Sequence, residues 1–186
     1  MNRNEYQSFS DLLLWDYIRR GDKIAFEQLY RRYYSPLLSY ALSFRYDRDK
    51  AEDCIQSLFV KLFTSEMLPA CRYVHAYLYR SFHHLLSDQS NLSTREVSVE
   101  EIEYDALGVE DEDLENLFAE DDESLLKSKK MLDAYARLPI NQQNAIYFYY
   151  IKEFTYDELS EILEISSHSC MNLVARAVAK MKQLLL

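Results

Sequence analysis

The chain has 186 residues, 48% of them hydrophobic and 28% charged, and a formal net charge of −10. It contains only 2 Gly and 3 Pro, which disfavours a fold of strands and tight turns and favours long helices. The length allows one medium domain or two small ones. No apolar run reaches membrane-spanning length and no basic-then-apolar segment opens the chain, so we expect no membrane segment.

The three cysteines, Cys54, Cys71 and Cys170, stand far apart and form no C-x-x-C pair. An odd number of separated cysteines without a secretory leader is typical of reduced thiols in the cytoplasm. We therefore expect a cytoplasmic protein without a metal site.

The negative charge is concentrated in one stretch of the chain. Residues 91–124 hold 14 acidic residues and one basic residue, whereas residues 1–90 and 125–186 are close to neutral. The apolar residues of the acidic stretch form no sustained helical stripe, apart from a short helix expected near 114–118. The sequence thus predicts an all-α protein of two small helical domains joined by an acidic linker.

Helix signals begin near residue 10 and continue through the first domain. Ser10 or Asp11 can cap a helix that Gly21 ends, and Asp22 can cap the next one. Pro36 should start a new helical segment or kink this second helix. The apolar residues of the second helix are Ala25, Phe26, Leu29, Tyr30 and Tyr33.

Residues 48–64 show the clearest helical periodicity in the chain. One stripe is apolar, at the i, i+3, i+4, i+7 spacing of a helix that buries one face. The opposite face is polar, and periodicity alone indicates only a core helix with a solvated side. The apolar residues are Ala51, Cys54, Ile55, Leu58, Phe59, Leu62 and Phe63, and the polar ones are Glu52, Asp53, Gln56, Ser57 and Lys61.

A loop at 65–72 leads into a helix expected over 73–87 that is rich in aromatic residues and histidine. Exposed aromatic rings with nearby cations suit unpaired bases and their phosphates, although such rings also fill cores. The adjacent His83 and His84 do not suggest a metal site, because neighbouring side chains diverge on a helix.

The second domain has the spacing of a helix-turn-helix. Pro139 ends a helix over 125–138, and another begins near Gln142. Thr155 and Glu158 form a capping box that starts a short helix. Ser166 then caps a final helix to about residue 185 after a three-residue turn, which is helix-turn-helix spacing.

Four groups of residues, in this order along the chain, resemble motifs of the extracytoplasmic-function (ECF) sigma factors, which are small initiation subunits of bacterial RNA polymerase. They are Gly21-Asp22-x-x-Ala25-Phe26, Ala51-Glu52-Asp53-x-x-Gln56-x-x-Phe59, Tyr77-Leu78-Tyr79-Arg80 and the carboxy-terminal set Leu138-Pro139, Phe154-Thr155-Tyr156-x-Glu158-Leu159-Ser160, Ile165-Ser166, Arg176-Ala177 and Lys180-Met181-Lys182. The resemblance implies a polymerase-binding domain at 1–90 and an upstream promoter-reading domain at 125–186.

The resemblance also implies three groups of site residues. Those for polymerase binding are Asp53, Gln56, Ser57 and Lys61. Those for the downstream promoter element are Arg72, Tyr77, Tyr79, Arg80, His83 and His84. Those for the upstream element are Ser167, His168, Ser169, Met171, Asn172, Arg176 and Lys180, among which Asn172 suits adenine and Arg176 suits guanine or phosphate.

The chain departs from the family pattern at several positions. His83-His84 replaces a basic residue followed by Asn, and no Lys or Arg occurs between Arg80 and Arg95. Glu164 stands where the family usually has Gly, and Met171 where basic residues are frequent. Each missing cation removes one released counterion from DNA binding, so we expect weaker DNA contacts than is usual in the family.

We interpret the sequence as an ECF-type sigma factor whose partners are core RNA polymerase and promoter DNA. The resemblance also makes an anti-sigma factor a possible partner, and the sequence alone does not show whether one exists. The alternatives are a sigma-like regulator with weakened promoter recognition and a helix-turn-helix regulator that does not bind polymerase. The chain has no glycine-rich phosphate loop, metal-spaced cluster or nucleophile-base pattern, so we expect neither an enzyme nor a cofactor.

Overall fold

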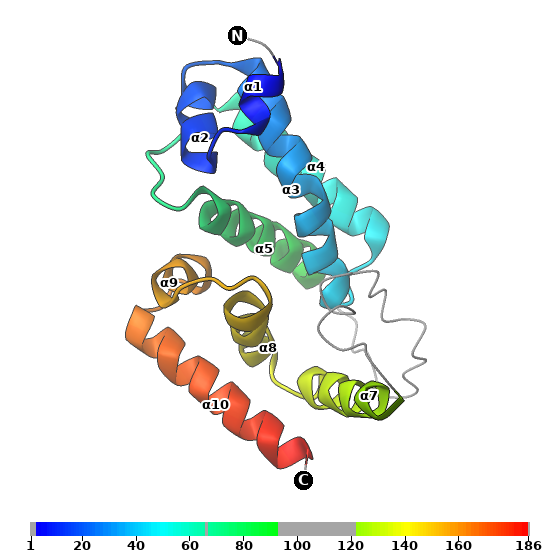
Figure 1. Ribbon diagram of the computed structural model, residues 1–186. Coiled ribbons are helices and arrows are strands. Elements are labelled where there is room, and N and C mark those ends of the chain that lie inside the picture. Colours follow the sequence, from blue (N-terminus) through cyan, green and yellow to red (C-terminus); the bar gives the residue numbers. More distant parts are fainter. Residues whose placement is uncertain (1–2, 66, 93–121, 186) are drawn as a thin grey trace. The chain divides into compact units, whose positions relative to one another are not determined.

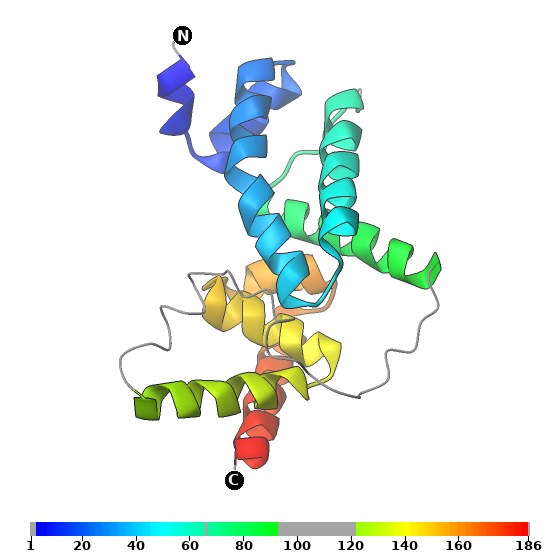
Figure 2. The same ribbon diagram turned by 90° about the vertical axis from the view of Figure 1, so that its right-hand side faces the viewer.

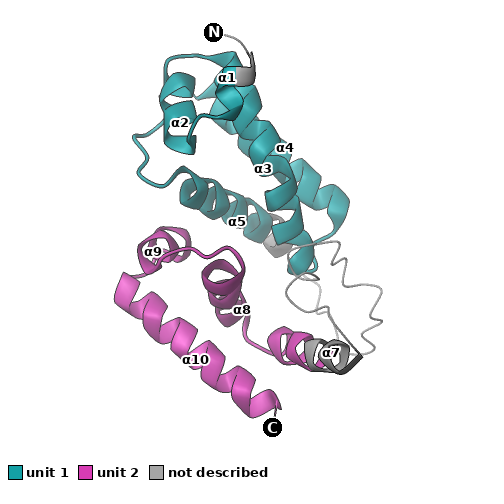
Figure 3. Cartoon of the chain, viewed as in Figure 1, with its two compact units in different colours: residues 1–109 teal, residues 110–186 magenta. Residues whose placement is uncertain are grey.

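The computed structural model describes residues 3–65, 67–92 and 122–185, which are coloured along the sequence in Figure 1. These residues form helices joined by short connections, with no strand among them. The all-α fold is therefore confirmed. The chain divides into two compact units, residues 1–109 and 110–186 (Figure 3).

The predicted acidic linker lies almost entirely outside the described residues. This applies to most of 91–124 and to the whole of the short helix expected at 114–118. The linker and the domain boundaries drawn from it therefore stay predictions. None of the described helices combines the length and the apolar character that crossing a membrane requires.

The described part of unit 1 consists of five helices: α1 (Arg3–Gln7), α2 (Asp11–Arg19), α3 (Lys23–Ser43), α4 (Arg48–Thr64) and α5 (Val74–Leu92). The predicted caps are confirmed, since Ser10 accepts from the Leu13 N–H and Asp22 accepts from two N–H groups of α3. Gly21 adopts φ 86° in the turn after α2, a conformation that glycine takes without steric cost.

Three features of unit 1 differ from the sequence prediction. Pro36 lies inside α3, which continues to Ser43, so no new helical segment begins there and only the predicted kink stays open. Buried residues on both sides of the proline, including Tyr33 and Leu37, hold the helix in the core. Helix α1 was not predicted, and α5 extends to Leu92, beyond the expected end at residue 87. Helix α4 has the predicted bounds.

The core of unit 1 lies where α5 crosses the antiparallel pair α3 and α4, with α2 against α3 and α5 (Figures 1 and 2). Burial of large apolar side chains is the main stabilising contribution in such a core. The largest fully buried side chains of this unit are Trp15, Tyr40, Phe82, Leu14, Leu29, Leu37, Ile55, Leu78 and Leu86.

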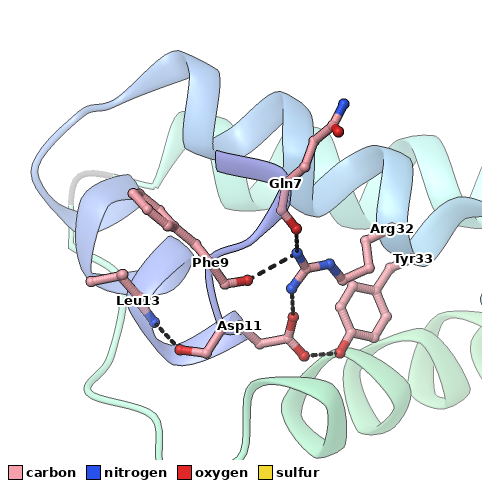
Figure 4. A network of polar contacts seen from close by, with 7 residues as sticks. Gln7, Phe9, Asp11, Leu13, Arg32 and Tyr33 are labelled. Atoms are coloured by element: carbon pink, nitrogen blue, oxygen red, sulfur yellow. Dashed lines mark hydrogen bonds and ion pairs between the residues drawn. The ribbon is translucent and has the colours of Figure 1, made fainter. Parts of the chain in front are cut away.

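A network of polar contacts around Arg32 fastens the first helices to α3 (Figure 4). The Arg32 guanidinium donates to the Asp11 carboxylate at 2.5 Å, to the Phe9 carbonyl at 2.9 Å and to the Gln7 carbonyl at 3.2 Å. The second oxygen of the same carboxylate accepts from the Tyr33 hydroxyl. The network satisfies carbonyls that precede α2 and fixes the position of α2 against α3.

Asp22 links helices α1 and α3 through one carboxylate. It accepts from the N–H groups of Ile24 and Ala25 at 2.8 and 3.0 Å, and from the Tyr6 hydroxyl at 2.7 Å. Burial acts to raise the pKa of Asp22, but the hydrogen bonds from Tyr6 and the two N–H groups outweigh burial and lower it. The bond to Asp22 raises the pKa of Tyr6 to about 12.

The lowered pKa of Asp22 predicts an acid-sensitive contribution to the stability of unit 1. A depressed carboxyl pKa stabilises the fold above the unfolded value of about 3.9, and this contribution disappears as the pH falls through the folded value. Asp22→Ala should cost about 1 to 2 kcal/mol at neutral pH. Asp22→Asn keeps a cap acceptor without the charge, so its urea-unfolding free energy should depend less on pH between about 5 and 2 than that of the wild type. Equal pH slopes for the two proteins would contradict this account of the cap.

The described part of unit 2 contains α7 (Asp122–Ala136), α8 (Ile140–Ile146), the π-helical turn η2 (Tyr147–Ile151), α9 (Tyr156–Leu163) and α10 (Ser167–Leu185). Helices α7, α8 and α9 all pack against α10 (Figure 1). The sequence predicted one helix where α8 and η2 lie, because π-helical turns leave no strong sequence signal. One buried cluster of this unit contains Leu138, Ile146 and Ala177, packed by Tyr135, Val178, Met181 and Leu184.

Candidate functional site

The four residues predicted to bind polymerase lie together on the outward face of α4. Asp53, Gln56, Ser57 and Lys61 are all exposed, and their i, i+3, i+4 and i+8 spacing places them along one line of the helix. Ala51, Cys54, Ile55, Leu58, Phe59 and Leu62 are buried on the opposite face. The face formed by these four polar residues is called the α4 face below.

Two large apolar residues lie exposed beside the α4 face. Val60 is 59% exposed and Phe63 is 55% exposed. The sequence placed Phe63 in the buried stripe, which is wrong, because only one edge of the helix end is covered there, by Phe26 at a ring distance of 5.1 Å. Two adjacent exposed apolar residues beside a polar face are compatible with a protein-binding surface.

Aromatic rings and guanidinium groups pair at the start of α5. Arg72 lies over the Tyr73 ring at 5.0 Å, and Arg80 lies over the Tyr77 ring at 5.7 Å. The edge of the Tyr77 ring meets Trp15 at a centroid distance of 5.2 Å. Arg72 is exposed, whereas Tyr77 and Arg80 are half-buried. A cation held on an aromatic face offers both charge and stacking surface to an unpaired strand.

Tyr79 does not belong to this surface. It is 2% exposed, and its ring meets that of Tyr40 edge-on at 5.6 Å. Helical periodicity explains the placement, because Tyr79 shares a face with the buried Phe82 and Leu86. Tyr79 is therefore a core residue, and its prediction as a DNA-binding residue is corrected. Of the two tyrosines predicted to contact DNA, only Tyr77 stays a candidate.

The two adjacent histidines differ in their surroundings. His83 is half-buried and shares a hydrogen bond of 3.0 Å between its Nδ1 and the Tyr40 hydroxyl. His84 is exposed one turn after Arg80. No group of three metal-ligating side chains occurs within the residues that the structure describes. His84 therefore extends the exposed polar surface of α5 beyond Arg80.

Helices α9 and α10 form the predicted helix-turn-helix. Thr155 and Glu158 make the capping box, with a Thr155 N–H to Glu158 bond of 2.7 Å and a return bond of 3.3 Å to the Thr155 hydroxyl. The Ser166 hydroxyl accepts from the Ser169 N–H at 3.1 Å and caps α10. The Ser167 hydroxyl donates to Asp157 at 2.7 Å, so the starts of the two helices are held together.

One long side of α10 faces outward within unit 2. Cys170, Val174 and Ala177 are buried on the inner side. On the outer side Met171 is 42% exposed, and Ser167 is half-buried because of its bond to Asp157. The other predicted residues of this helix are exposed: His168, Ser169, Asn172, Arg176 and Lys180.

The outer side of α10 has the chemistry of a groove-reading helix. His168, Asn172 and Arg176 follow each other at i, i+4 and i+8 and so form one row. The Arg176 Nε donates to the Asn172 carbonyl at 3.3 Å, which lays the guanidinium along the helix. Amide and guanidinium groups in such a row can bond to base edges, and ammonium groups further along can bond to phosphates.

The sequence analysis did not identify three features of the candidate sites: the exposed Val60, the Arg32 network and the contacts of Trp15. Val60 gave no signal because a lone apolar residue on a polar face is common. The Arg32 network and the contacts of Trp15 join residues that are distant in sequence, and no local pattern encodes such pairs. Periodicity could have found the burial of Tyr79, because Tyr79, Phe82 and Leu86 repeat at helical spacing.

Comparison with known proteins narrows the class of protein that this fold defines. The family model described as Sigma-70, region 4 matches residues 128–181. The ECF RNA polymerase sigma factor SigM of Bacillus subtilis (strain 168) is 25% identical over 162 residues, which make up 85% of this chain and 93% of that protein. The structure of CnrH in complex with the cytosolic domain of CnrY has a similar fold, with a TM-score of 0.66 at 20% identity, over 94% of this chain and 96% of that chain.

A helical chain whose second unit presents an exposed helix-turn-helix has the fold that many DNA-binding transcription proteins use. Within that class, the region 4 match and the similarity to SigM support an ECF-type sigma factor of the sigma-70 family. The resemblance seen in the sequence motifs is thereby confirmed.

The turn between α9 and α10 yields a stability prediction. Glu164 adopts φ 55° at the end of α9, a left-handed conformation that costs a residue with a Cβ about 1 kcal/mol. Glu164→Gly should therefore stabilise unit 2 by up to about 0.5 kcal/mol after the greater unfolded-state entropy of glycine is allowed for. Glu164→Ala, which keeps the Cβ, is the control in thermal unfolding. A glycine variant that unfolds at a lower temperature than the alanine variant would contradict this explanation.

Proposed function

We propose that this sigma factor binds core RNA polymerase through the α4 face and promoter DNA through α5 and α10. The α4 face carries the proposal. The exposed Val60 and Phe63 lie beside Gln56 and Asp53, so this part of α4 combines apolar and polar groups. A partner with a complementary apolar and polar surface would bury these residues. The curated relative is named as an RNA polymerase sigma factor, and its match extends over unit 1 and unit 2.

For the downstream promoter element, the proposed contacts are Arg72, Tyr77, Arg80, His83 and His84. The two guanidinium groups over tyrosine rings supply the cations and the stacking surface that an unpaired strand requires. Arg80 is the one Lys or Arg of α5. This sparse charge favours a second candidate function, a sigma-like regulator that binds polymerase and recognises promoters weakly.

For the upstream promoter element, the proposed reading helix is α10. Its exposed row of His168, Asn172 and Arg176 would face the base edges of the major groove. Ser167, Ser169 and Lys180 would approach the phosphates that flank them. The capped amino terminus of α10 adds a favourable dipole toward a phosphate.

The chain would act by binding, with nucleotide chemistry left to the polymerase, and would work in the cytoplasm, where the polymerase is. CnrH was solved in complex with the cytosolic domain of CnrY. A protein partner for this chain, an anti-sigma factor, is part of the proposal.

The polymerase assignment predicts the result of changing the α4 face. Asp53→Ala combined with Gln56→Ala should weaken binding to core polymerase by about 30-fold or more, because central interface residues contribute at least about 2 kcal/mol. The unfolding free energy should be unchanged, since both side chains are exposed.

The measurement is co-purification with core enzyme and titration by fluorescence anisotropy. Gln7→Ala combined with Asp16→Ala removes the same two residue types from α1 and α2 and serves as the matched control. A double α4 variant that binds core polymerase like this control would remove the α4 face from the interface.

The α10 assignment predicts how DNA binding depends on salt. Arg176→Gln and Lys180→Gln should each reduce the magnitude of the slope of log affinity against log salt by about 1. Each variant removes one cationic side chain that contacts a phosphate or a base edge. Asn172→Ala should instead relax the preference at one base pair by about 1 to 3 kcal/mol. Lys130→Gln on α7 is the charge-matched control. The readout is anisotropy of a duplex carrying the upstream element at several salt concentrations, and unchanged slopes would exclude α10 as the reading helix.

A further inference from the structure

Two side chains of α2 donate hydrogen bonds to consecutive carbonyls of the loop between α4 and α5. The Trp15 indole Nε1–H donates to the Pro69 carbonyl at 2.9 Å. The Arg19 Nε–H donates to the Leu68 carbonyl at 3.1 Å. Trp15 and Arg19 are four residues apart and therefore lie on the same side of α2. The loop consists of residues 67–73 and is called the 67–73 loop below.

The loop backbone depends on α2 because it has little regular structure of its own. Residues 67–73 lie between the ends of α4 and α5. Leu68 is 7% exposed and fixes one point of the loop in the core, whereas Met67 is 85% exposed. Bonds from two directional donors to adjacent carbonyls restrict the intervening peptide far more than one apolar contact does.

Helix α2 is itself a rigid support. Its first residue, Asp11, is held by Arg32 of α3, and Ser10 caps its amino terminus. Trp15 is 1% exposed. A donor on a packed and capped helix holds its acceptor in one position. A donor on a mobile loop would move together with its acceptor and would not fix it.

Trp15 also contacts the start of α5. The edge contact between Trp15 and Tyr77 at 5.2 Å places the indole between the 67–73 loop and the ring that carries Arg80. The same loop ends with Arg72 over Tyr73. One indole therefore sets the position of the loop relative to the aromatic and cationic surface of α5.

We propose that Trp15 and Arg19 are positioning residues for the unpaired DNA strand. They hold the 67–73 loop against α5 so that Arg72 and the Tyr77–Arg80 pair form one continuous binding surface before DNA arrives. A surface fixed in advance loses less conformational entropy when it binds. The inference rests on the proposed role of α5 in strand binding. It adds that α2 supports strand binding indirectly, without touching the DNA.

The test compares Arg19→Gln and Trp15→Phe with Arg20→Gln. Arg20 is the exposed neighbour of Arg19, so its variant removes the same charge from the same end of α2. Trp15→Phe keeps an aromatic ring against Tyr77 and removes the N–H donor. Arg19→Gln changes a surface side chain, and its fold is therefore retained even if the Trp15 variant is less stable.

The first readout is hydrogen exchange of the loop amides in the free full-length chain. Exchange over residues 67–73 should accelerate about fivefold to tenfold in Arg19→Gln and in Trp15→Phe, because the loop opens more often once the bond to one of its carbonyls is lost. It should be unchanged in Arg20→Gln. Trp15 is the single tryptophan of the chain, so its emission in Arg19→Gln should shift to longer wavelength as the loop loosens.

The second readout is strand capture by the holoenzyme. The probe is a promoter fragment, transcribed by the wild-type holoenzyme, whose downstream element is pre-melted by mismatches. The lifetime of the complex should shorten about fivefold to tenfold in Arg19→Gln and Trp15→Phe, while binding to core polymerase stays at the wild-type value. Because the strand is already open, a shorter lifetime reports capture and not melting.

Three outcomes would overturn the proposal, and they are distinguishable. Loop exchange equal in all three variants would show that α2 does not hold the loop. A loosened loop with wild-type lifetimes would show that loop position does not matter for the strand. A wild-type holoenzyme that does not retain the pre-melted fragment would refute the proposed role of α5, and with it the role of α2, even though the exchange differences remained.

Discussion

The burial of one face of α4 is the constraint on which the account of unit 1 depends. Ala51, Cys54, Ile55 and Leu58 pack into the core with α3 and α5. Burial of a large side chain such as Ile55 or Leu58 contributes about 1.5 to 3 kcal/mol. That burial fixes the rotation of the helix. Asp53 and Gln56 must then face outward together, because a rotation that buried them would place unpaired polar groups in the core. The same packing gives α5 a fixed support, on which the paired tyrosines and arginines lie.

Polar contacts and caps, more than glycine turns, set the geometry between helices in this glycine-poor chain. Asp22 and Ser166 begin helices by accepting backbone N–H groups. Arg45, Glu153 and Glu164 adopt left-handed conformations that glycine usually supplies. Such residues cost stability locally, and hydrogen bonds and packing elsewhere in the unit offset that cost. The Arg32 network and the bonds from Trp15 and Arg19 to the 67–73 loop hold α2 to its neighbours in the same way.

Much of this structure could be predicted from the sequence, and the failures have physical causes. Periodicity and capping residues gave the bounds of α4, the helix-turn-helix and the exposed sides of α4 and α10. They did not decide between a new helical segment and a kink at Pro36, where tertiary packing keeps α3 continuous. They also failed for Phe63, because a periodic pattern does not say how far the neighbouring helices extend. The bond from Trp15 to the Pro69 carbonyl joins residues 54 positions apart, so no local pattern could reveal it.

Run-off transcription tests the central claim most directly. Purified core RNA polymerase would be given a pool of genomic promoter fragments from the source organism, with and without this protein. The account predicts specific transcripts only when the protein is present, and their loss with the Asp53→Ala/Gln56→Ala variant. Stable binding to core polymerase without any transcript would contradict promoter-specific initiation and leave a sigma-like regulator. No binding to core polymerase at all would contradict the assignment of the α4 face.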